Sequence, residues 1–432
     1  MTTSVDHPSP PPGPDDKGGF VAPARSGTAR RAGRLPPAIW VLGLVSLFMD
    51  VSSEMIHGLL PAYLVGTVGL SVAMVGLLDG VAEATALGVK VFSGAISDAL
   101  GRRKILAVIG YGLAALCKPL FAVGDVAVVI TARVVDRFGK GIRGAPRDAL
   151  VADLAPSAMR GAAFGLRQSL DSVGALLGPL LAIALMMALD DDVRTVFLIA
   201  AIPGGLSVLL LAAFVREPPR SDAATQRPLQ WPLRTAELRR LPSSYWSVVA
   251  VGAALMAARF SEGFLVLRAQ HQGLALTLVP LVLVGLNIVY AASAWPAGRL
   301  ADRVSRPTLL AVALAVLLVS QLVFTFDGPG PVAVGVALWG LHLGLSQGVI
   351  SAMVADTAPS SLRGTAFGVF HLVSGVATLL SSTVAGVAWE VSGPVTTFFF
   401  GAAMTTLTLV GLLVVRRRSA VRPDGGAPTS TS

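Results

Sequence analysis

The chain has 432 residues, of which 53% are apolar and only 14% are charged, whereas an ordinary soluble domain carries about 25% charged residues. So few charges exclude a water-soluble surface, and the mean hydropathy of +0.71 is typical of a membrane protein. The single cysteine, Cys117, excludes a disulfide framework. The net charge is +9, but Lys and Arg are scattered between apolar runs, which favours the inner surface of a lipid bilayer over nucleic acid as partner.

The chain begins with a polar segment and continues with two sets of apolar runs. Residues 1–36 are rich in Pro, Gly, Ser and charge, and we expect a disordered cytoplasmic tail there, not a cleavable signal peptide. A helix needs roughly 20 residues to cross the hydrocarbon core. Six such runs lie within residues 37–215: Ile39 to Leu60, Val72 to Ala95, Ile105 to Val123, Val126 to Ala152, Gly161 to Leu189 and Val193 to Val215.

An Arg-rich stretch, residues 216–242, is the expected cytoplasmic linker to a second set within residues 243–415. These runs are Tyr245 to Leu267, Leu276 to Ala297, Leu309 to Phe326, Val332 to Asp356, Thr365 to Trp389 and Val395 to Val415. Residues 416–432 are basic and then low in complexity, so we expect a second cytoplasmic tail.

The distribution of Lys and Arg predicts the orientation. If the spans alternate, most positive charge falls on one side, whereas the opposite loops hold mainly Asp; Arg194 and Arg268 are exceptions. The first side carries Arg102, Arg103, Lys104, Arg160, the linker arginines, Arg303, Arg306, Arg363 and Arg416 to Arg418. Because Lys and Arg accumulate in cytoplasmic loops, both termini and the linker are predicted to be cytoplasmic, in a multi-pass protein of the plasma membrane.

The two halves repeat each other in sequence. Residues 151–177 read VADLAPSAMRGAAFGLRQSLDSVGALL and residues 354–380 read VADTAPSSLRGTAFGVFHLVSGVATLL, an offset of 203. Gly94, Asp98 and Arg102 recur as Gly298, Asp302 and Arg306 at an offset of 204. The chain is therefore predicted to be a duplicated six-helix unit with a pathway between its halves.

These features resemble the major facilitator superfamily of secondary transporters. The resemblance covers about residues 37–415 and includes the motif G-x-x-x-D-x-x-G-R-R at Gly94, Asp98, Gly101, Arg102 and Arg103. It implies an all-α polytopic membrane protein with twelve transmembrane helices in two pseudo-symmetric six-helix bundles, which moves a small solute by alternating access. It also implies that Asp98 and Asp302 pair with helix termini and nearby Arg to latch the outward-facing state.

Four further segments are compared with that superfamily. In the second copy of the loop motif, Ser305 and Pro307 replace a Gly and an Arg, so the loop around Arg306 is expected to act less tightly. The fourth span is similar to a family pattern at Arg137, Lys140, Gly141, Arg143, Gly144 and Ala145. The fifth is similar to an antiporter pattern at Gly165, Gly174, Gly178 and Pro179, which lets helices approach closely. The stretch DRFGKGIRGAPRDALVAD is similar to an efflux-like branch.

Ionisable residues inside the spans are the main site candidates, because a charge at the bilayer centre costs about 2.5 to 3.5 kcal/mol. Asp50, Glu54 and His57 share one face of the first span, as Asp79, Glu83 and Lys90 do in the second. The fourth and fifth spans add Arg133, Asp136, Arg137, Lys140, Arg143, Arg147, Asp148, Arg167 and Asp171. Seven cationic positions balance seven acidic ones, so ion pairs between helices explain this set as well as selection of an anion does.

Proton coupling needs a carboxylate that gains and loses a proton near neutral pH. Asp50 and Glu54 are the first candidates for this role, and Asp79 and Glu83 are the next. His57 is expected to line a cavity, because no second His or Cys lies at metal-ligand spacing. The C-terminal half is sparser and offers Arg259, Glu262, Asn287 and His371 as substrate contacts, with Asn287 in the repeat position of Glu83.

The preferred function is proton-coupled antiport, hence export of a small solute. Uptake by proton symport or facilitated diffusion, and a non-transporting membrane sensor, are the alternatives. No phosphate-binding loop, catalytic triad or metal cluster is present in the sequence, so we expect no enzymatic activity, no cofactor and no metal. The expected partners are a small-molecule substrate, protons and the lipid bilayer, and the expected state is a monomer.

Overall fold

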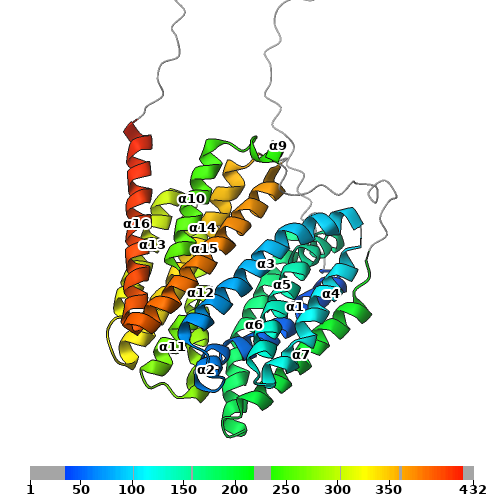
Figure 1. The fold of residues 1–432 in the computed structure, drawn as a ribbon. Helices are drawn as coiled ribbons and strands as arrows, with labels where there is room; N and C mark the ends of the chain where they lie inside the picture. The colour runs from blue at the N-terminus through cyan, green and yellow to red at the C-terminus, as the bar shows by residue number, and fades with distance from the viewer. Residues whose placement is uncertain are drawn as a thin grey trace, which may run out of the picture. The chain divides into compact units, whose positions relative to one another are not determined.

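The structure, a computed structural model, describes residues 35–100, 102–156, 159–217, 235–301, 303–359 and 362–421. Helices make up nearly all of these residues, and none of them forms a strand (Figure 1). Eleven described segments are long and apolar enough to cross a membrane. A further helix, α5 (Val126–Leu154), has 29 residues, but its charged side chains keep it outside that group. The predicted all-α polytopic fold is confirmed.

The described residues of the first half form eight helical elements. They are α1 (Pro37–His57), α2 (Leu60–Gly66), α3 (Val72–Leu100), α4 (Arg103–Leu116), the 3-10 helix η1 (Lys118–Ala122), α5, α6 (Arg160–Ala188) and α7 (Val193–Phe214). N-cap side chains accept backbone N–H groups at the start of three of them: Ser71 accepts that of Met74 at 3.2 Å before α3, Asp125 accepts that of Val128 at 3.0 Å before α5, and Asp192 accepts those of Arg194 and Thr195 before α7.

The second half repeats this order. Its elements are α9 (Thr235–Leu238), α10 (Ser243–Ala258), α11 (Gly263–His271), the 3-10 helix η3 (Leu276–Leu278), α12 (Leu281–Ala301), α13 (Arg306–Val323), α14 (Pro329–Thr357), α15 (Arg363–Ser392) and α16 (Pro394–Val421). The expected tails lie almost entirely outside the described residues, as does most of the expected linker, although α16 continues beyond the predicted end at Val415.

Two spans predicted as continuous helices are broken. The first separates into α1 and α2 at Gly58 and Leu59, and the seventh separates into α10 and α11 at residues 259–262. At the repeat offset of 203, position 58 corresponds to position 261, so the two breaks are symmetry-related. Pro61, at the start of α2, has no N–H for a continuous helical hydrogen-bond ladder. The third span similarly changes to a 3-10 helix where Pro119 follows Lys118.

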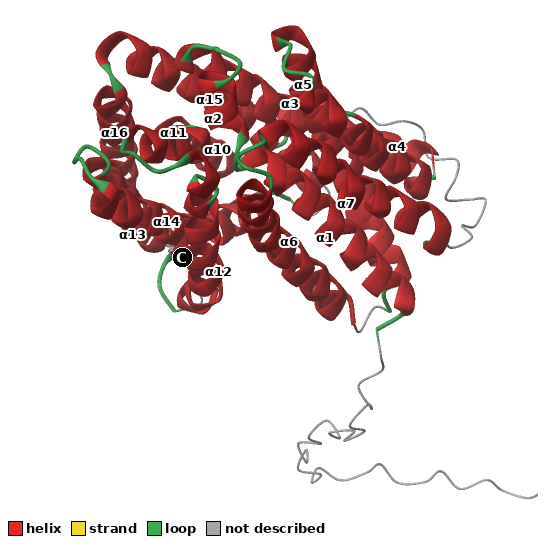
Figure 2. Ribbon diagram, turned by 90° about the horizontal axis from the view of Figure 1, so that it is seen from below, coloured by secondary structure: helices red, strands yellow, loops and turns green. Residues whose placement is uncertain are grey.

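The two halves pack along two pairs of helices. Helix α3 lies along α15, and α6 contacts α12. A Cβ atom built at Gly80 would come within 2.8 Å of the Cα of Leu379, and one at Gly386 within 2.9 Å of the Cα of Ala73. These glycines therefore allow the backbones of opposite halves to approach closely. Figure 2 shows α4, α5 and α7 on one side and α13, α14 and α16 on the other.

Polar contacts between the halves gather at one end of the molecule, where α2 lies against α11 (Figure 1). At this α2–α11 end, Ser261 donates to Asp79 at 2.8 Å, the backbone N–H of Ala73 donates to Glu390 at 3.2 Å, and Thr277 donates to Asp191. The opposite end, where α4 begins at Arg103, shows no polar contact between the two halves among the described residues. The contacts thus close the interface at the end that the charge pattern predicts to be external.

Arg268, one of the two exceptions to the charge pattern, has a structural explanation. Its buried guanidinium donates to the carbonyl oxygens of Phe324 and Phe326 and pairs with Asp327 at 2.9 Å. Hydrogen bonds from Arg268 and Gln272 hold the pKa of Asp327 below its usual range. Arg268 therefore ties α11 to the loop after α13, and its position at this end need not reflect membrane orientation.

Candidate functional site: the central cavity

A cavity of about 350 Å³ lies between the two halves. The N-terminal half contributes charged side chains to it from four helices, whereas the C-terminal half contributes neutral residues of α12. Its lining comprises Asp50, Glu54, Glu83, Ala86, Leu87, Lys90, Lys140, Arg143, Gly144, Arg147, Gln168, Asp171, Ser172, Ala175, Asn287, Tyr290 and Ala291. Nine of the site candidates named from the sequence thus meet here: Asp50, Glu54, Glu83, Lys90, Lys140, Arg143, Arg147, Asp171 and Asn287.

Close packing of α6 on α1 positions the first wall of the cavity. A Cβ atom at Gly174 would come within 2.7 Å of the carbonyl oxygen of Leu47, and one at Gly178 within 2.8 Å of that of Val51. Glycine at these positions therefore brings α6 next to the face of α1 that carries Asp50 and Glu54. A Cβ atom at Gly165 would meet nothing within 4 Å, so the close packing expected there is wrong, because Gly165 lies on the exposed side of α6. Pro179 is buried inside α6.

Several predicted cavity residues instead form closed ion pairs. Arg133 donates to Asp79 at 2.8 Å, and both side chains are buried. Asp136 accepts from Lys118 at 2.8 Å, again with both partners buried. None of Asp79, Arg133 and Asp136 lines the cavity. The first pair lies between α3 and α5, and the second lies between α5 and η1, so both pairs are held between helices.

Lys118 was absent from the predicted set. It is 1% exposed, and it also donates to Ser53 at 3.0 Å. It follows an apolar run, ILAVIGYGLAALC, which is why hydropathy alone did not single it out. A lysine within a predicted span requires a carboxylate partner, and that rule was the available signal.

Two weaker pairs border the cavity. Arg137 lies 3.9 Å from Glu83 and 3.8 Å from Asp136, so it bridges α3 and α5 without lining the cavity. His57 lies 3.5 Å from Glu54, within α1. The side chain of Glu83 is 41% exposed and that of Glu54 is 25% exposed, so both carboxylates are accessible from the cavity.

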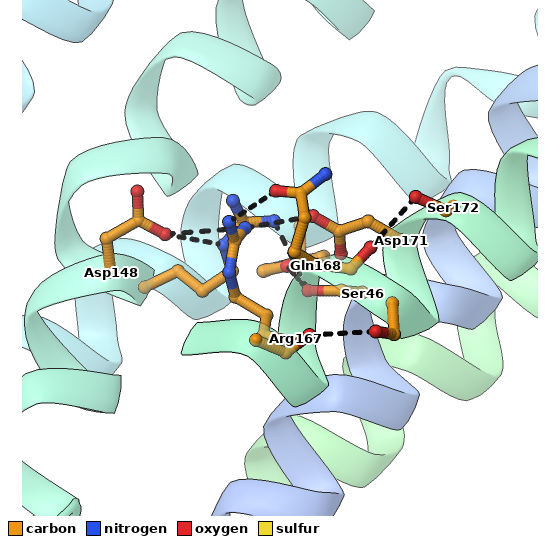
Figure 3. Close-up of polar contacts among 10 residues, drawn as sticks. Ser46, Asp148, Arg167, Gln168, Asp171 and Ser172 are labelled. Atoms are coloured by element: carbon orange, nitrogen blue, oxygen red, sulfur yellow. Dashed lines mark hydrogen bonds and ion pairs between the residues drawn. The ribbon is translucent and has the colours of Figure 1, made fainter. Parts of the chain in front are cut away.

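A network of charges closes one side of the cavity, between α5 and α6 (Figure 3). Arg167 pairs with Asp171 at 2.9 Å and with Asp148 at 3.6 Å, and it donates to Gln168 at 3.2 Å. Arg147 donates to Asp148 and to Ser46, each at 3.2 Å. These contacts neutralise both arginines, so Arg167 is a structural partner of Asp171 and does not itself line the cavity.

Three cavity-lining groups differ from all of these. The carboxylate of Asp50 and the ammonium groups of Lys90 and Lys140 form no hydrogen bond or ion pair with any other residue in the described ranges. Arg143 also lacks an ion pair there, but its guanidinium lies 4.7 Å from the centre of the Tyr111 ring, a stabilising cation–π contact. Asp50, Lys90 and Lys140 are therefore cavity charges that a solute can contact without displacing a partner of the protein.

The C-terminal candidates divide between two places. Arg259 and Glu262 lie in the break between α10 and α11, where Arg259 contacts the Sδ atom of Met256 at 3.7 Å. His371 contacts the rings of Phe367 and Phe370 on α15. These three residues do not line the cavity, because the wall on this side comes from α12, which supplies Asn287 and Tyr290.

The loop motifs contain a symmetric pair of salt bridges at the end opposite the α2–α11 end. Arg103 pairs with Asp153 at 2.5 Å, and Arg306 pairs with Asp356. Both residues of each pair differ by 203 positions from their counterparts, so Arg306 corresponds to Arg103 and not to Arg102. The Asp98 side chain, Gly101 and Asp302 lie outside the described residues, and their predicted latch stays a prediction. Arg102 forms no comparable salt bridge among the described residues, and Gly94 has no side chain that could form one.

The sequence also matches known proteins. The family sequence model described as Major Facilitator Superfamily matches residues 42–281 and 249–431 of this chain. An uncharacterised MFS-type transporter of Methanocaldococcus jannaschii is 32% identical over 390 residues, which is 87% of this chain and 94% of that protein. Quinolone resistance protein NorA of Staphylococcus aureus is 28% identical over 198 residues, 46% of this chain and 50% of that protein.

Solved structures share the fold at low sequence identity. The nucleoside transporter NupG matches with a TM-score of 0.72 at 12% identity, over 88% of this chain and 100% of that one. A bacterial homologue of the human lysosomal transporter Spinster, in an inward-facing and unoccupied conformation, matches with a TM-score of 0.64 at 16% identity, over 90% and 96% of the chains. Together with the family match along the sequence, this shows that the chain belongs to the Major Facilitator Superfamily and is a multi-pass membrane transporter of that type.

Proposed function

We propose that this chain moves a small polar solute through the central cavity by alternating access, and that movement is coupled to binding of a proton at Asp50. The observation that carries the coupling is the state of the carboxylates. Asp79 and Asp171 are held in short ion pairs, whereas Asp50 lines the cavity without a direct partner among the described residues.

A carboxylate in a short ion pair resists protonation, because the proton would leave its cationic partner unpaired. Asp50 can gain a proton without breaking such a contact. Its charged neighbours are Asp171 on α6 and Arg143, Arg147 and Lys140 on α5. A like charge and three opposite charges face it, so a solute that shifts any of these cations changes the free energy of protonation at Asp50.

Alternating access requires the α2–α11 end to open. The hydrogen bonds from Ser261 to Asp79 and from Thr277 to Asp191 join the two halves there. Ser261 lies in the break of the seventh span, so the C-terminal half holds Asp79 through a non-helical segment. We propose that this contact breaks on outward opening while the Arg133–Asp79 pair remains intact.

Two directions of transport each have support. The similarity to a quinolone resistance protein over half of the chain favours export in exchange for protons. The unpaired lysines of the cavity favour symport as the second candidate, because an anion bound beside them makes protonation of Asp50 easier.

The test uses Asp50→Asn in liposomes, with a solute identified by a thermal-shift screen of the purified protein. Solute exchange should survive, because the cavity keeps its shape, while accumulation driven by a proton gradient should be lost. Asp171→Asn is the matched comparison, and it should impair both activities because it leaves Arg167 with a weaker set of partners. Full gradient-driven accumulation by Asp50→Asn would contradict the coupling role, whereas the sign of the gradient that drives wild-type flux separates export from symport.

A further inference from the structure

This inference rests on the proposed function, because it names the chemical class of the solute. We propose that the transported solute carries a negatively charged group, such as a carboxylate, that is held by Lys90 and Lys140 in the central cavity. The two lysines come from different helices and lack a negatively charged partner, and a single anionic group bound between them would provide one.

The two lysines converge from neighbouring helices. Lys90 lies on α3 and Lys140 lies on α5, and these helices pack against each other. A Cβ atom at Gly144, one turn after Lys140, would lie 3.7 Å from the Cε of Lys90. The aliphatic stem of Lys90 therefore passes α5 at van der Waals distance, next to the turn that carries Lys140. Both side chains line the cavity.

The charge count of the N-terminal half supports an anion. When Lys118 is added to the seven cations and seven carboxylates identified inside the spans from the sequence, the set holds eight cations against seven carboxylates. The cations are Lys90, Lys118, Arg133, Arg137, Lys140, Arg143, Arg147 and Arg167, and the carboxylates are Asp50, Glu54, Asp79, Glu83, Asp136, Asp148 and Asp171. The balance expected from the sequence is therefore wrong, because Lys118 occupies Asp136 and leaves a cation elsewhere without a counter-charge.

The surplus is located in the cavity. Among the described cavity-lining groups that lack a hydrogen bond or ion pair, three are cations, Lys90, Lys140 and Arg143, and one is an anion, Asp50. Arg143 is stabilised by the Tyr111 ring, whereas the two lysines have no such contact. Unpaired charges at membrane depth are costly, and ammonium groups form their strongest hydrogen bonds with carboxylate or phosphate oxygens. One bound anion therefore reduces this excess of positive charge.

The opposite wall suits the remainder of such a solute. Asn287 and Tyr290 of α12 also line the cavity and add no charge to it. Tyr290 is oriented by a hydrogen bond of 3.2 Å to the side-chain oxygen of Gln347. A cavity of about 350 Å³ is at the small end of ligand sites, so it fits a small organic anion with polar or aromatic parts.

The test compares three probes of nearly equal size that differ in charge: benzoate, benzamide and benzylamine. Their affinities for the purified full-length protein in lipid nanodiscs are measured by calorimetry. We expect benzoate to bind at least tenfold more tightly than the other two. Lys90→Gln and Lys140→Gln should each weaken benzoate about tenfold, the loss of one hydrogen bond to a charged group, while Lys140→Arg should retain most of the affinity.

Lys104→Gln is the control, because Lys104 donates to the carbonyl oxygen of Ala212 at 2.8 Å, away from the cavity. It should leave benzoate binding unchanged. Tighter binding of benzylamine, absence of benzoate binding, or wild-type affinity in both Gln variants would each overturn the inference.

A second measurement separates this result from the proposed function. A cysteine at Ser382, a buried residue of α15 whose backbone lies against Gly76 of α3, reports opening of the α2–α11 end by reaction with a membrane-impermeant maleimide in a Cys117→Ser background. Reaction at Ser382→Cys together with failure of benzoate binding overturns only the anion site. Complete protection of that cysteine under all conditions contradicts alternating access itself, whatever benzoate does.

Discussion

The two halves agree at their ends and differ in the middle. Both first spans break at symmetry-related positions, and both loop motifs hold equivalent salt bridges, Arg103 with Asp153 and Arg306 with Asp356. In the cavity, however, Lys140 and Arg147 correspond to Leu343 and Ile350 at the offset of 203. The features that shape and join the helices are duplicated, whereas the charges that face a solute are found in one copy.

The same asymmetry extends to the carboxylates. Asp50 and Glu54 correspond to Ala253 and Ala257, and Glu83 corresponds to Asn287. A cavity with one charged wall and one neutral wall separates two tasks. We infer that the N-terminal half responds to protons and solute charge, while the C-terminal half provides shape and neutral hydrogen bonds.

The largest expected effect concerns the buried pair of Asp79 and Arg133, which has no charged counterpart in the second half. Asp79→Asn leaves Arg133 buried without its carboxylate, and such a loss costs about 3 to 5 kcal/mol. The repeat position of Arg133 is Val336, where Val336→Ala removes two methyl groups and should cost less, about 1 to 2 kcal/mol. Denaturant unfolding in detergent measures both.

A double variant sharpens this result. Asp79→Leu combined with Arg133→Met removes both charges, and we expect it to recover much of the stability lost by Asp79→Asn, because no buried charge remains unpaired. Equal losses from Asp79→Asn and Val336→Ala would show that the charges of the first half are no more important for stability than the apolar contacts of the second.

The sequence predicted the helices far better than their breaks. A span raises the mean hydropathy over about 20 residues, so its existence is robust to single residues. The break at Gly58 and Leu59 depends on where Pro61 and the neighbouring helices fall, and the break around Ser261 depends on hydrogen bonds to Asp79 and Ser382 across the fold. Such long-range contacts leave no local periodic signal.

The site was predicted in part for a similar reason. Helical periodicity predicted Asp50 and Glu54 on one face, and the repeat offset identified Asn287 as the counterpart of Glu83; all four residues line the cavity. Periodicity does not tell which charges meet each other, so Arg133 and Asp136 were grouped with Lys140 although partners on α3 and η1 hold them away from the cavity. The partner of Asp136, Lys118, was not predicted, because it follows a run of uncharged residues and has no charged neighbour at helical spacing in that run.

An intermediate effect is expected from the duplicated salt bridges. The Arg103 side chain is 12% exposed and also donates to the carbonyl oxygen of Ala149 at 2.9 Å, whereas that of Arg306 is 34% exposed. Arg103→Gln should therefore lower the free energy of unfolding by about 1 kcal/mol, and Arg306→Gln by less than about 0.5 kcal/mol.

Unfolding of both variants, with Arg299→Gln as a control on the same surface, measures the difference. A larger loss in Arg306→Gln would reverse the order that burial predicts. Equal losses would mean that the two salt bridges contribute equally to stability in spite of their different exposure.

The smallest expected effect concerns the starts of the last helices of each half. Asp192 caps α7, whereas α16, its repeat counterpart, begins at Pro394. Hydrogen bonds from the hydroxyl and backbone N–H of Thr195 hold the pKa of Asp192 below its usual range. A carboxyl group whose pKa is lower in the folded state stabilises that state above its ordinary pKa, and the contribution is lost as the pH falls through the lowered value.

Acidification should therefore speed amide hydrogen exchange, after correction for its intrinsic pH dependence, in the first turn of α7 but not in that of α16. Asp192→Asn should show faster exchange at neutral pH and little further change on acidification, because an amide still accepts a hydrogen bond but does not titrate. If the first turns of both helices respond equally to acid in the wild type, the asymmetry at these starts does not come from the Asp192 cap.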